Sequence, residues 1–241
     1  MLKQLVALPT NQPLYAAYLS RLGFKRDQLV YYVKAGWLVR LHHGVYSRPG
    51  VDLSALQVLR ATQSQLKAPL YVGGKSALSL QGESYAIVAS PSYLVFCPPD
   101  FRVNAYLKTF ANLSFRKNRQ FPDMQTGVEL LLDGLTVSSR ERGILEMADE
   151  VSGDNTFEEF YNVMELLTSL RSSLLQTLLE SSNSIKSKRI FLSVAARLNF
   201  KWYGNLDLSR VQLGSGSREI GRGGEYDRKF RIILPRLHNG L

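Results

Sequence analysis

The N-terminal fold is decided by the stretch KRDQLVYYVKAGWLVRLHHGVY, residues 25–46. Apolar side chains recur at helical spacing in its first half, which predicts a helix over residues 25–35 that ends at Gly36. The inward stripe of this helix consists of Leu29, Tyr32 and Val33. The second half has strand character on both sides of a turn at Gly44, so we expect a short hairpin.

A shorter helix is expected before this stretch. Asn11-Gln12-Pro13 combines an amide cap with a proline, which is favoured in the first turn of a helix. Apolar residues recur at helical spacing from Leu14, and Gly23 ends the helix. Two helices followed by a hairpin predict a winged helix-turn-helix from Leu5 to Arg48. In this motif the second helix enters the major groove of duplex DNA, and the wing touches the neighbouring backbone.

The second helix and the wing carry the side chains that we expect to contact DNA. Arg26 and Gln28 lie near the N-terminal end of the helix, which reaches base edges in this motif. The expected contact residues are Lys25, Arg26, Gln28, Tyr31 and Lys34 on the helix, and Arg40, His42, His43 and Arg48 on the wing.

Several alternatives apply to these residues. Tyr31 or Tyr32 completes the core in place of a DNA contact, and we favour this role for Tyr32. A metal site at His42 and His43 is disfavoured, because neighbours in a strand point to opposite faces and His238 is the only other histidine. Winged helices also serve as protein-interaction modules, but the basic outer face favours DNA.

The composition is that of an ordinary folded protein, with 45% hydrophobic and 21% charged residues. Cys97 is the only cysteine, which excludes an intrachain disulfide and a cysteine-rich zinc site. We see neither an apolar run of roughly 18 residues, the length that crosses a bilayer, nor a secretory signal. We therefore expect a cytoplasmic protein with no membrane partner.

The net charge of +10 is unevenly distributed along the chain. Residues 1–50 carry +6, residues 51–184 carry −4 and residues 185–241 carry +8. Clustered positive charge is typical of nucleic-acid binding, because neutralised phosphates release counterions. A solvated basic surface that maintains solubility explains the charge equally well, so charge alone does not separate the two interpretations.

The whole pattern predicts an α+β protein, with a winged helix-turn-helix over residues 1–50 and a larger mixed α/β C-terminal domain over residues 51–241. The expected helices cover residues 51–67, 75–80, 139–151, 156–167, 169–179 and 186–198. The expected strands cover residues 85–88, 93–97, 113–116 and 135–137, and a final hairpin ends in residues 230–234. Ser138 and Glu141 have the spacing of a capping box before the helix over residues 139–151.

Motifs for nucleotide binding and catalysis fail when they are tested in full. Gly74-Lys75-Ser76 matches the end of a Walker A loop, but position 69 is a proline and not the required glycine. A dinucleotide fingerprint that begins at Gly214 fails at Glu219. Asp227 and Lys229 have the spacing of a metal-dependent nuclease, which is the less favoured alternative. We therefore predict no enzyme, no catalytic residue, no cofactor and no metal.

Four ordered segments carry a family resemblance. Residues 29–40, closing on Gly44-Val45-Tyr46, look like a winged-helix signature. The other three segments are YVGGKSALSLQG at 71–82, VSSRER at 137–142, and LGSGSR at 213–218 with GGEYDRKF at 223–230. Over nearly the whole chain, these segments resemble the AbiEi-type antitoxins, the transcriptional autorepressors of type IV toxin–antitoxin systems.

The resemblance implies a function and two partners. The N-terminal module would bind double-stranded operator DNA and repress its own operon, and the C-terminal domain would oppose a nucleotidyltransferase toxin without a stable complex. An orphan winged-helix regulator is the alternative, because some members lack a neighbouring toxin. We expect a monomer that binds cooperatively to repeats.

The resemblance also assigns motif residues to the antitoxin domain. They are Gly73, Gly74, Lys75, Ser76, Arg140, Glu141, Arg218 and Lys229. One departure concerns the wing, which is often richer in arginine in the family, whereas this chain has His42 and His43. Histidine is mostly neutral near pH 7, so we expect this wing to hold phosphates less strongly.

Overall fold

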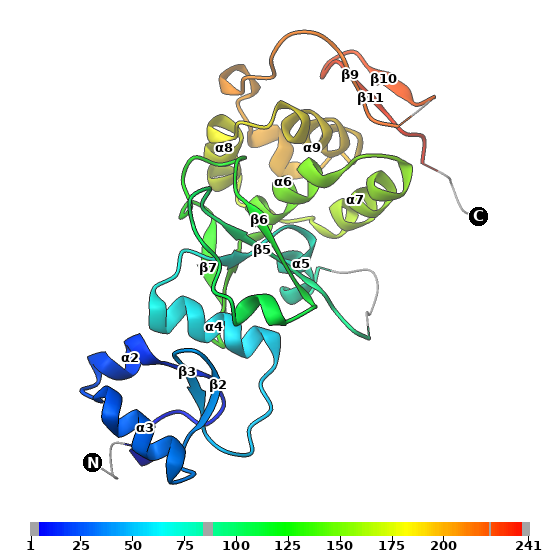
Figure 1. Ribbon diagram of the computed structural model, residues 1–241. Coiled ribbons are helices and arrows are strands. Elements are labelled where there is room, and N and C mark those ends of the chain that lie inside the picture. The colour runs from blue at the N-terminus through cyan, green and yellow to red at the C-terminus, as the bar shows by residue number, and fades with distance from the viewer. Residues whose placement is uncertain (1–4, 84–88, 222, 238–241) are drawn as a thin grey trace.

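The computed structural model describes residues 5–83, 89–221 and 223–237. A three-stranded antiparallel sheet forms the N-terminal end, in the order β1 (Leu14–Tyr15), β3 (Val45–Ser47) and β2 (Val39–His42). Helices α2 (Ala16–Arg21) and α3 (Arg26–Lys34) lie beside it (Figure 1). Their shared core contains Leu5, Leu14, Leu19, Phe24, Leu29, Tyr32 and Leu38. The predicted winged helix-turn-helix is confirmed, and we call the β2–β3 hairpin the wing.

The first helix begins later than Asn11-Gln12-Pro13 predicted. Leu14 and Tyr15 form a strand that pairs with β3, and α2 begins only at Ala16. The prediction of a helix from Leu14 was therefore wrong, because pairing with a distant strand outweighs the local helix signal. Gly23 does end α2 as predicted, with φ of +90°.

Helix α4 (Ala55–Leu66) joins the winged helix to the rest of the chain. The buried Gln65 side chain accepts a hydrogen bond from the backbone N–H of Tyr15 (3.0 Å) and donates one to the carbonyl of Pro13 (2.7 Å). The Tyr15 hydroxyl lies 2.6 Å from Oγ1 of Thr62. A side chain of α4 thus satisfies backbone groups at the free edge of β1, where a strand neighbour is missing. Ser54 caps the start of α4, because its hydroxyl accepts a hydrogen bond from the backbone N–H of Gln57.

A five-stranded mixed sheet lies on the other side of α4 (Figure 1). Its order is β6 (Leu113–Lys117), β5 (Tyr93–Cys97), β4 (Tyr71–Val72), β8 (Thr136–Ser138) and β7 (Val128–Leu130). The β5–β6 and β4–β8 pairs are parallel, and the β4–β5 and β7–β8 pairs are antiparallel. Helix α5 (Gly74–Leu80) follows β4, and the short helix η1 (Leu107–Thr109) lies between β5 and β6 in the chain.

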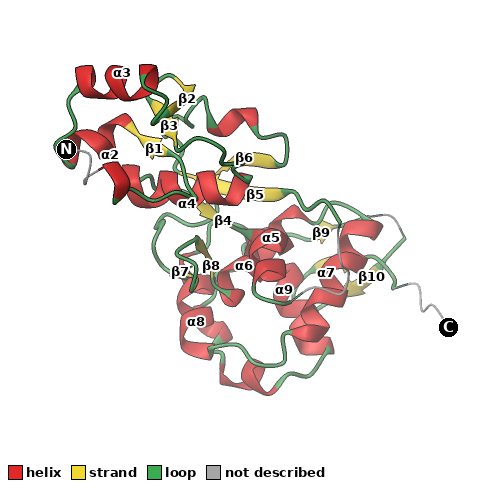
Figure 2. Ribbon diagram, turned by 90° about the horizontal axis from the view of Figure 1, so that it is seen from below, coloured by secondary structure: helices red, strands yellow, loops and turns green. Residues whose placement is uncertain are grey.

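Four helices form the next layer: α6 (Arg140–Glu150), α7 (Asp154–Leu166), α8 (Ser172–Ser181) and α9 (Ile185–Arg197). Phe157, Phe160 and Phe191 are buried in their core. Short helices η2 (Lys201–Asn205) and η3 (Leu208–Arg210) lead to a small sheet, ordered β10 (Glu225–Asp227), β11 (Ile232–Leu234) and β9 (Arg218–Glu219). Figures 1 and 2 show this sheet at the opposite end of the molecule from α3.

The larger mixed α/β part is confirmed, and most predicted elements match the observed ones within a few residues. The strand predicted over residues 85–88 lies outside the described residues. Within the described ranges, no helix has the length and apolar character needed to cross a membrane.

Candidate nucleic-acid interface and the polar core behind it

Helix α3 presents a basic, solvent-exposed face. Lys25, Arg26 and Lys34 are exposed, and no carboxylate among the described residues lies within salt-bridge distance of them. Tyr31 is 63% exposed, whereas Tyr32 is buried in the core as predicted. The two tyrosine rings meet edge to face at 5.8 Å between centroids. The face away from the core therefore carries three cations, the carboxylate of Asp27 and an aromatic ring, and its net charge is positive.

Gln28 has a local role that its predicted DNA contact did not anticipate. Its Oε1 accepts a hydrogen bond from the backbone N–H of Lys25 at 2.7 Å. This bond satisfies one of the donors left unpaired at a helix N-terminus. A substitution of Gln28 would therefore disturb the start of α3 as well as any DNA contact.

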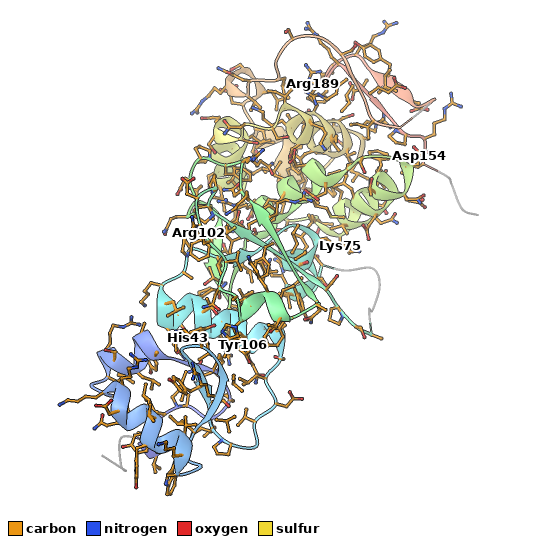
Figure 3. The ribbon with its side chains drawn as sticks, viewed as in Figure 1. His43, Lys75, Arg102, Tyr106, Asp154 and Arg189 are labelled. Atoms are coloured by element: carbon orange, nitrogen blue, oxygen red, sulfur yellow. The ribbon has the colours of Figure 1, made fainter. Side chains whose placement is uncertain are left out.

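The wing is packed against the part of the chain that follows it. His42 is half-buried, with its ring 6.1 Å from the ring of Tyr106, just before η1. Burial raises the pKa of the Tyr106 hydroxyl. His43 and Arg40 are exposed, with Arg40 Nη2 3.1 Å from His43 Nδ1, and Figure 3 shows His43 and Tyr106 at the junction with η1. The wing thus offers mainly Arg40 and His43 to solvent, with the half-buried Arg48 just beyond β3.

Two of the sequence motifs meet in a buried polar network around Glu146 on α6. This carboxylate, 1% exposed, accepts from the Tyr71 hydroxyl (2.9 Å), the Gly74 backbone N–H (2.8 Å), the Ser138 hydroxyl (2.6 Å) and Arg142 Nε (3.0 Å). All four donors point at one buried charge. The network therefore ties β4, α5 and β8 to α6.

Arg142 completes this network from one turn earlier on α6. Its buried guanidinium also donates to the Tyr71 hydroxyl (2.8 Å) and to the carbonyls of Asp123 (3.1 Å) and Thr126 (2.6 Å). It lies 4.8 Å from the centroid of the Tyr71 ring and 4.5 Å from that of Phe121. Burial, and then the Glu146 carboxylate, raise the pKa of Tyr71. Because solvent does not reach these groups, we interpret the network as structural.

Gly73 is the N-cap of α5 and Gly74 is its first residue, and the network explains why Gly73 is a glycine. A Cβ built on Gly73 would lie 2.4 Å from Glu146 Oε2 and 2.5 Å from a ring carbon of Phe96. Lys75 forms an ion pair with Glu159 of α7. Gly73 and Lys75 therefore have structural roles, since both help to hold α5 against its neighbours. No Walker A loop is expected here, because the motif already failed in the sequence.

Ser76 supports the same helix from another side. Its hydroxyl accepts from the backbone N–H of Leu94 at 2.9 Å, which joins α5 to β5. Lys75 and Ser76 also line an open cleft of about 650 Å³ between α5, β5, α6 and α7. The cleft lining includes the apolar side chains of Leu80, Leu94 and Met147.

The capping box predicted from Ser138 and Glu141 is wrong. Ser139 caps α6 instead, with its hydroxyl accepting from the backbone N–H of Arg142 at 3.3 Å. Ser138 precedes it and is turned inward to Glu146. The network around Glu146 thus determines which of two adjacent serines caps the helix.

Glu141 binds Arg171 instead of the helix terminus. Its carboxylate accepts from the backbone N–H (2.8 Å), Nε (3.1 Å) and Nη2 (2.7 Å) of Arg171. Burial alone would raise the pKa of Glu141, but these hydrogen bonds outweigh it and the pKa is lowered. Arg140, its neighbour, is half-exposed and forms an ion pair with Glu83 at 2.8 Å.

The residues of the nuclease alternative form a turn. The Asp227 carboxylate accepts from the Ser193 hydroxyl (2.5 Å) and from the backbone N–H groups of Lys229 (2.9 Å) and Phe230 (3.2 Å). Lys229 Nζ lies 3.0 Å from the Tyr203 hydroxyl. Among the described residues, no three His, Cys, Asp or Glu side chains gather in a way that suits a metal ion. Arg218 is exposed on β9, in a separate strand.

The sequence interpretation did not identify Arg142, Glu146 or the buried Arg189 of α9 as important. Arg142 and Glu146 are four residues apart on a helix that also buries Ile144, Leu145 and Ala148, and this spacing places both on one face. Arg189 follows Lys186 and Lys188 in the basic first part of α9 and directly precedes the apolar Ile190 and Phe191. A charged residue among buried apolar residues is the signal that points to a buried, fully paired group.

The fold and the exposed basic face define a winged helix-turn-helix protein with a large mixed α/β domain attached. Residues 1–88 match the family model "Transcriptional regulator, AbiEi antitoxin N-terminal domain". Residues 95–235 match the model "Transcriptional regulator, AbiEi antitoxin, Type IV TA system". The chain therefore belongs to the AbiEi antitoxin family of transcriptional regulators, and the resemblance seen in the sequence is confirmed.

A solved structure supports the same fold over almost the whole chain. The crystal structure of the RV2827C protein from Mycobacterium tuberculosis is similar with a TM-score of 0.67, covering 96% of this chain and 88% of that one. Its sequence identity of 13% means that the similarity concerns the fold alone. Among curated proteins, no match to the sequence was found.

Proposed function

We propose that this chain binds operator DNA in the promoter of its own operon and represses that operon, with α3 in the major groove. The observation that supports this most is the exposed face formed by Lys25, Arg26 and Lys34, which have no carboxylate partner in the described part of the chain. Unpaired cations on a groove-sized helix attract phosphates and release counterions. Arg26, at the N-terminal end of α3, is the residue best placed to contact a base edge.

The second part of the proposal concerns the larger domain. We infer that residues 51–241 oppose a nucleotidyltransferase toxin encoded beside this gene, without a stable complex between the two proteins. Membership of the AbiEi antitoxin family supports this role. We further propose that the protein is a monomer in solution and binds cooperatively to repeated operator sites.

The DNA-binding half is tested by fluorescence anisotropy with a labelled duplex from the protein's own promoter and a shuffled duplex. Arg26→Ala should weaken binding to the promoter by about 1–3 kcal/mol and reduce the preference over the shuffled duplex. Lys34→Ala should weaken binding to both duplexes by a similar factor. It should also lower the slope of log K against log salt concentration by about 1. Arg210→Ala is the matched control, because Arg210 is exposed in η3 and pairs with Glu180 at 2.8 Å.

If wild type, Arg26→Ala and Lys34→Ala bind the promoter with equal affinity, α3 does not contact the DNA. Gln28→Ala is a poor probe, because Gln28 also holds the first turn of α3. Equal affinity of wild type for both duplexes would show that binding lacks sequence specificity.

The antitoxin half is tested by co-expression with the neighbouring nucleotidyltransferase. Co-expression should restore the growth of cells that produce the nucleotidyltransferase. A pull-down should yield no stoichiometric complex between the two proteins. Arg26→Ala should still rescue growth while it derepresses a reporter driven by the operon promoter. Loss of both rescue and repression in a folded Arg26→Ala protein would contradict the division of roles.

A further inference from the structure

Strand β6 is an outer strand of the five-stranded sheet, and it pairs with β5 on one side only. Just after β6, the backbone N–H of Asn118 donates to the carbonyl of Cys97 at 2.8 Å, so Asn118 faces β5. Successive residues of a strand face its two sides alternately, and the backbone groups of Phe115 and Lys117 therefore face away from β5. Among the described residues, no group forms a hydrogen bond with these outward N–H and C=O groups. The outer edge of β6 can thus accept another strand.

A groove lies beside the same strand. It consists of the cleft of about 650 Å³ described above and a smaller hollow of about 280 Å³. Glu150 of α6 lines both, so the two adjoin. On β6, Ser114 lines the cleft and Arg116 lines the smaller hollow, and both side chains are exposed. Residues two apart in a strand share one face, so both hollows open on the same face of β6. We call the cleft and the smaller hollow together the β6 groove.

The cleft suits a bulky apolar side chain. Leu94 of β5 and Met147 of α6 line it, together with Leu80 and Val151. Its rim is polar, since Lys75 pairs there with Glu159. An apolar lining inside a polar rim is typical of a pocket that removes one apolar side chain from water.

The smaller hollow suits a carboxylate. The carboxylates that line it already have partners within the chain, namely Arg142 for Glu146, Arg116 for Glu150 and the Ser184 hydroxyl for Asp149. Lys117 is engaged as well, because its Nζ donates to the carbonyl of Pro98 at 3.3 Å. Arg119 is exposed in the lining, and no carboxylate of the described ranges lies within salt-bridge distance of it. A carboxylate from outside the chain therefore finds a guanidinium available at Arg119.

We propose that the β6 groove binds an extended peptide segment of a partner protein, which adds to the sheet as a strand next to β6. The peptide backbone pairs with the outward groups of Phe115 and Lys117, and side chains on one face of the peptide enter the two hollows. Side chains two positions apart in a strand are about 6–7 Å apart, which matches the offset between Ser114 and Arg116 on β6. The segment therefore carries a bulky apolar residue and, two positions away, an aspartate or glutamate.

The test begins with a displayed library of random heptapeptides, selected on the full-length protein. We expect enrichment of peptides in which an apolar residue and an acidic residue are two positions apart. The most enriched peptide is then labelled and titrated by fluorescence anisotropy. Arg119→Glu should weaken binding by about tenfold or more, because it turns attraction for the acidic residue into repulsion. Ser114→Phe should also weaken binding, because the larger side chain fills the cleft.

Arg102→Glu is the matched control for the charge reversal. Arg102 is exposed, has no carboxylate within salt-bridge distance in the described ranges, and does not line the groove. Figure 3 shows Arg102 and the cleft residue Lys75 on opposite sides of the molecule. Peptide affinity of Arg102→Glu should therefore equal that of wild type.

Amide hydrogen exchange of the wild type tests strand addition without any substitution. With saturating peptide, the amides of Phe115 and Lys117 should exchange more slowly, because they gain hydrogen-bond partners. The amide of Asn118 already donates to Cys97 and should change much less.

Several results would overturn the proposal. They are a selection without enrichment, enriched peptides that lack the acidic residue, equal peptide affinity of wild type and folded Arg119→Glu, and unchanged exchange at Phe115 and Lys117. A concentration-dependent dimer of the wild type that Arg119→Glu abolishes would assign the groove to a second copy of this chain and would also overturn it. None of these measurements involves α3 or the promoter.

Discussion

Glu146→Gln is the substitution that probes the buried polar core most sharply. The change keeps the size of the side chain and removes its charge. Glu146 Oε1 accepts from Tyr71 and Arg142, and Oε2 accepts from Gly74 and Ser138. A glutamine has only one acceptor oxygen, so its NH2 group must face either the Gly74 N–H or Arg142 Nε, and neither can reverse its role.

The expected cost follows from what Arg142 loses. Both side chains of the pair are at most 1% exposed, and breaking a buried ion pair by removal of one partner costs about 3–5 kcal/mol. For a chain of this size, 1 kcal/mol shifts the melting temperature by about 2–4 °C. Glu146→Gln should therefore lower the melting temperature by roughly 6–20 °C.

Urea unfolding followed by circular dichroism measures the change in the free energy of unfolding, with a scan of melting temperature beside it. Arg140→Gln is the matched control on the same helix, because its ion pair with Glu83 is half-exposed and worth about 0–1 kcal/mol. Arg142→Met with Glu146→Gln should cost less than the sum of the two single variants, since neither partner is left charged. A loss below about 1 kcal/mol for Glu146→Gln, or strict additivity in the double variant, would refute the reasoning.

Three further predictions concern stability. The pKa of Glu141 is lowered in the folded state, so its pair with Arg171 stabilises the fold above the ordinary pKa of 4.5 and loses this effect as pH falls through the folded value; in pH-dependent urea unfolding the deficit of Arg171→Met should shrink toward acid pH, and a constant deficit would contradict the linkage. Gly73→Ala should cost about 1–3 kcal/mol through overpacking, whereas Gly153→Ala, with no atom within 4 Å of its Cβ, should cost less than half as much in the same assay. Gln65→Ala should leave the N–H of Tyr15 in β1 and the carbonyl of Pro13 just before it unpaired and cost about 1–3 kcal/mol, and faster amide exchange in β1 than in β11 would locate the loss; unchanged exchange would show that α4 does not hold β1.

Local signals in the sequence predicted most of the fold. Residues 93–97 form β5 as predicted, because this apolar segment ends at two prolines. Gly36 and Gly44 end α3 and turn the wing with φ of +74° and +69°. Strand β1 could not be predicted in the same way, since Leu14 and Tyr15 have helical spacing and become a strand only through β3 and Gln65. Pairing with residues that are distant in the sequence cannot be predicted from a short stretch of sequence.

In the candidate interface too, some features follow from the local sequence and others depend on residues that are distant in the chain. The exposure of Lys25, Arg26 and Lys34 follows from their place off the apolar stripe of one helix. The packing of His42 against Tyr106 depends on a residue far along the chain, so the sequence did not reveal it. The charge of residues 185–241 pointed to a basic C-terminal end, but the hydrogen bonds from the buried Arg189 to the carbonyls of Leu213, Gly216 and Arg231 are visible only in the structure.

The central claim is that the basic face of α3 holds promoter DNA, and its most direct test is the salt dependence of binding. Wild type and the triple variant Lys25→Ala, Arg26→Ala, Lys34→Ala are titrated against the promoter duplex from low to physiological salt. Each lost phosphate contact lowers the slope of log K against log salt by about 0.9. We predict weaker binding by the triple variant and a slope lower by up to about 2.7. The same affinity and the same slope for the two proteins would contradict the account.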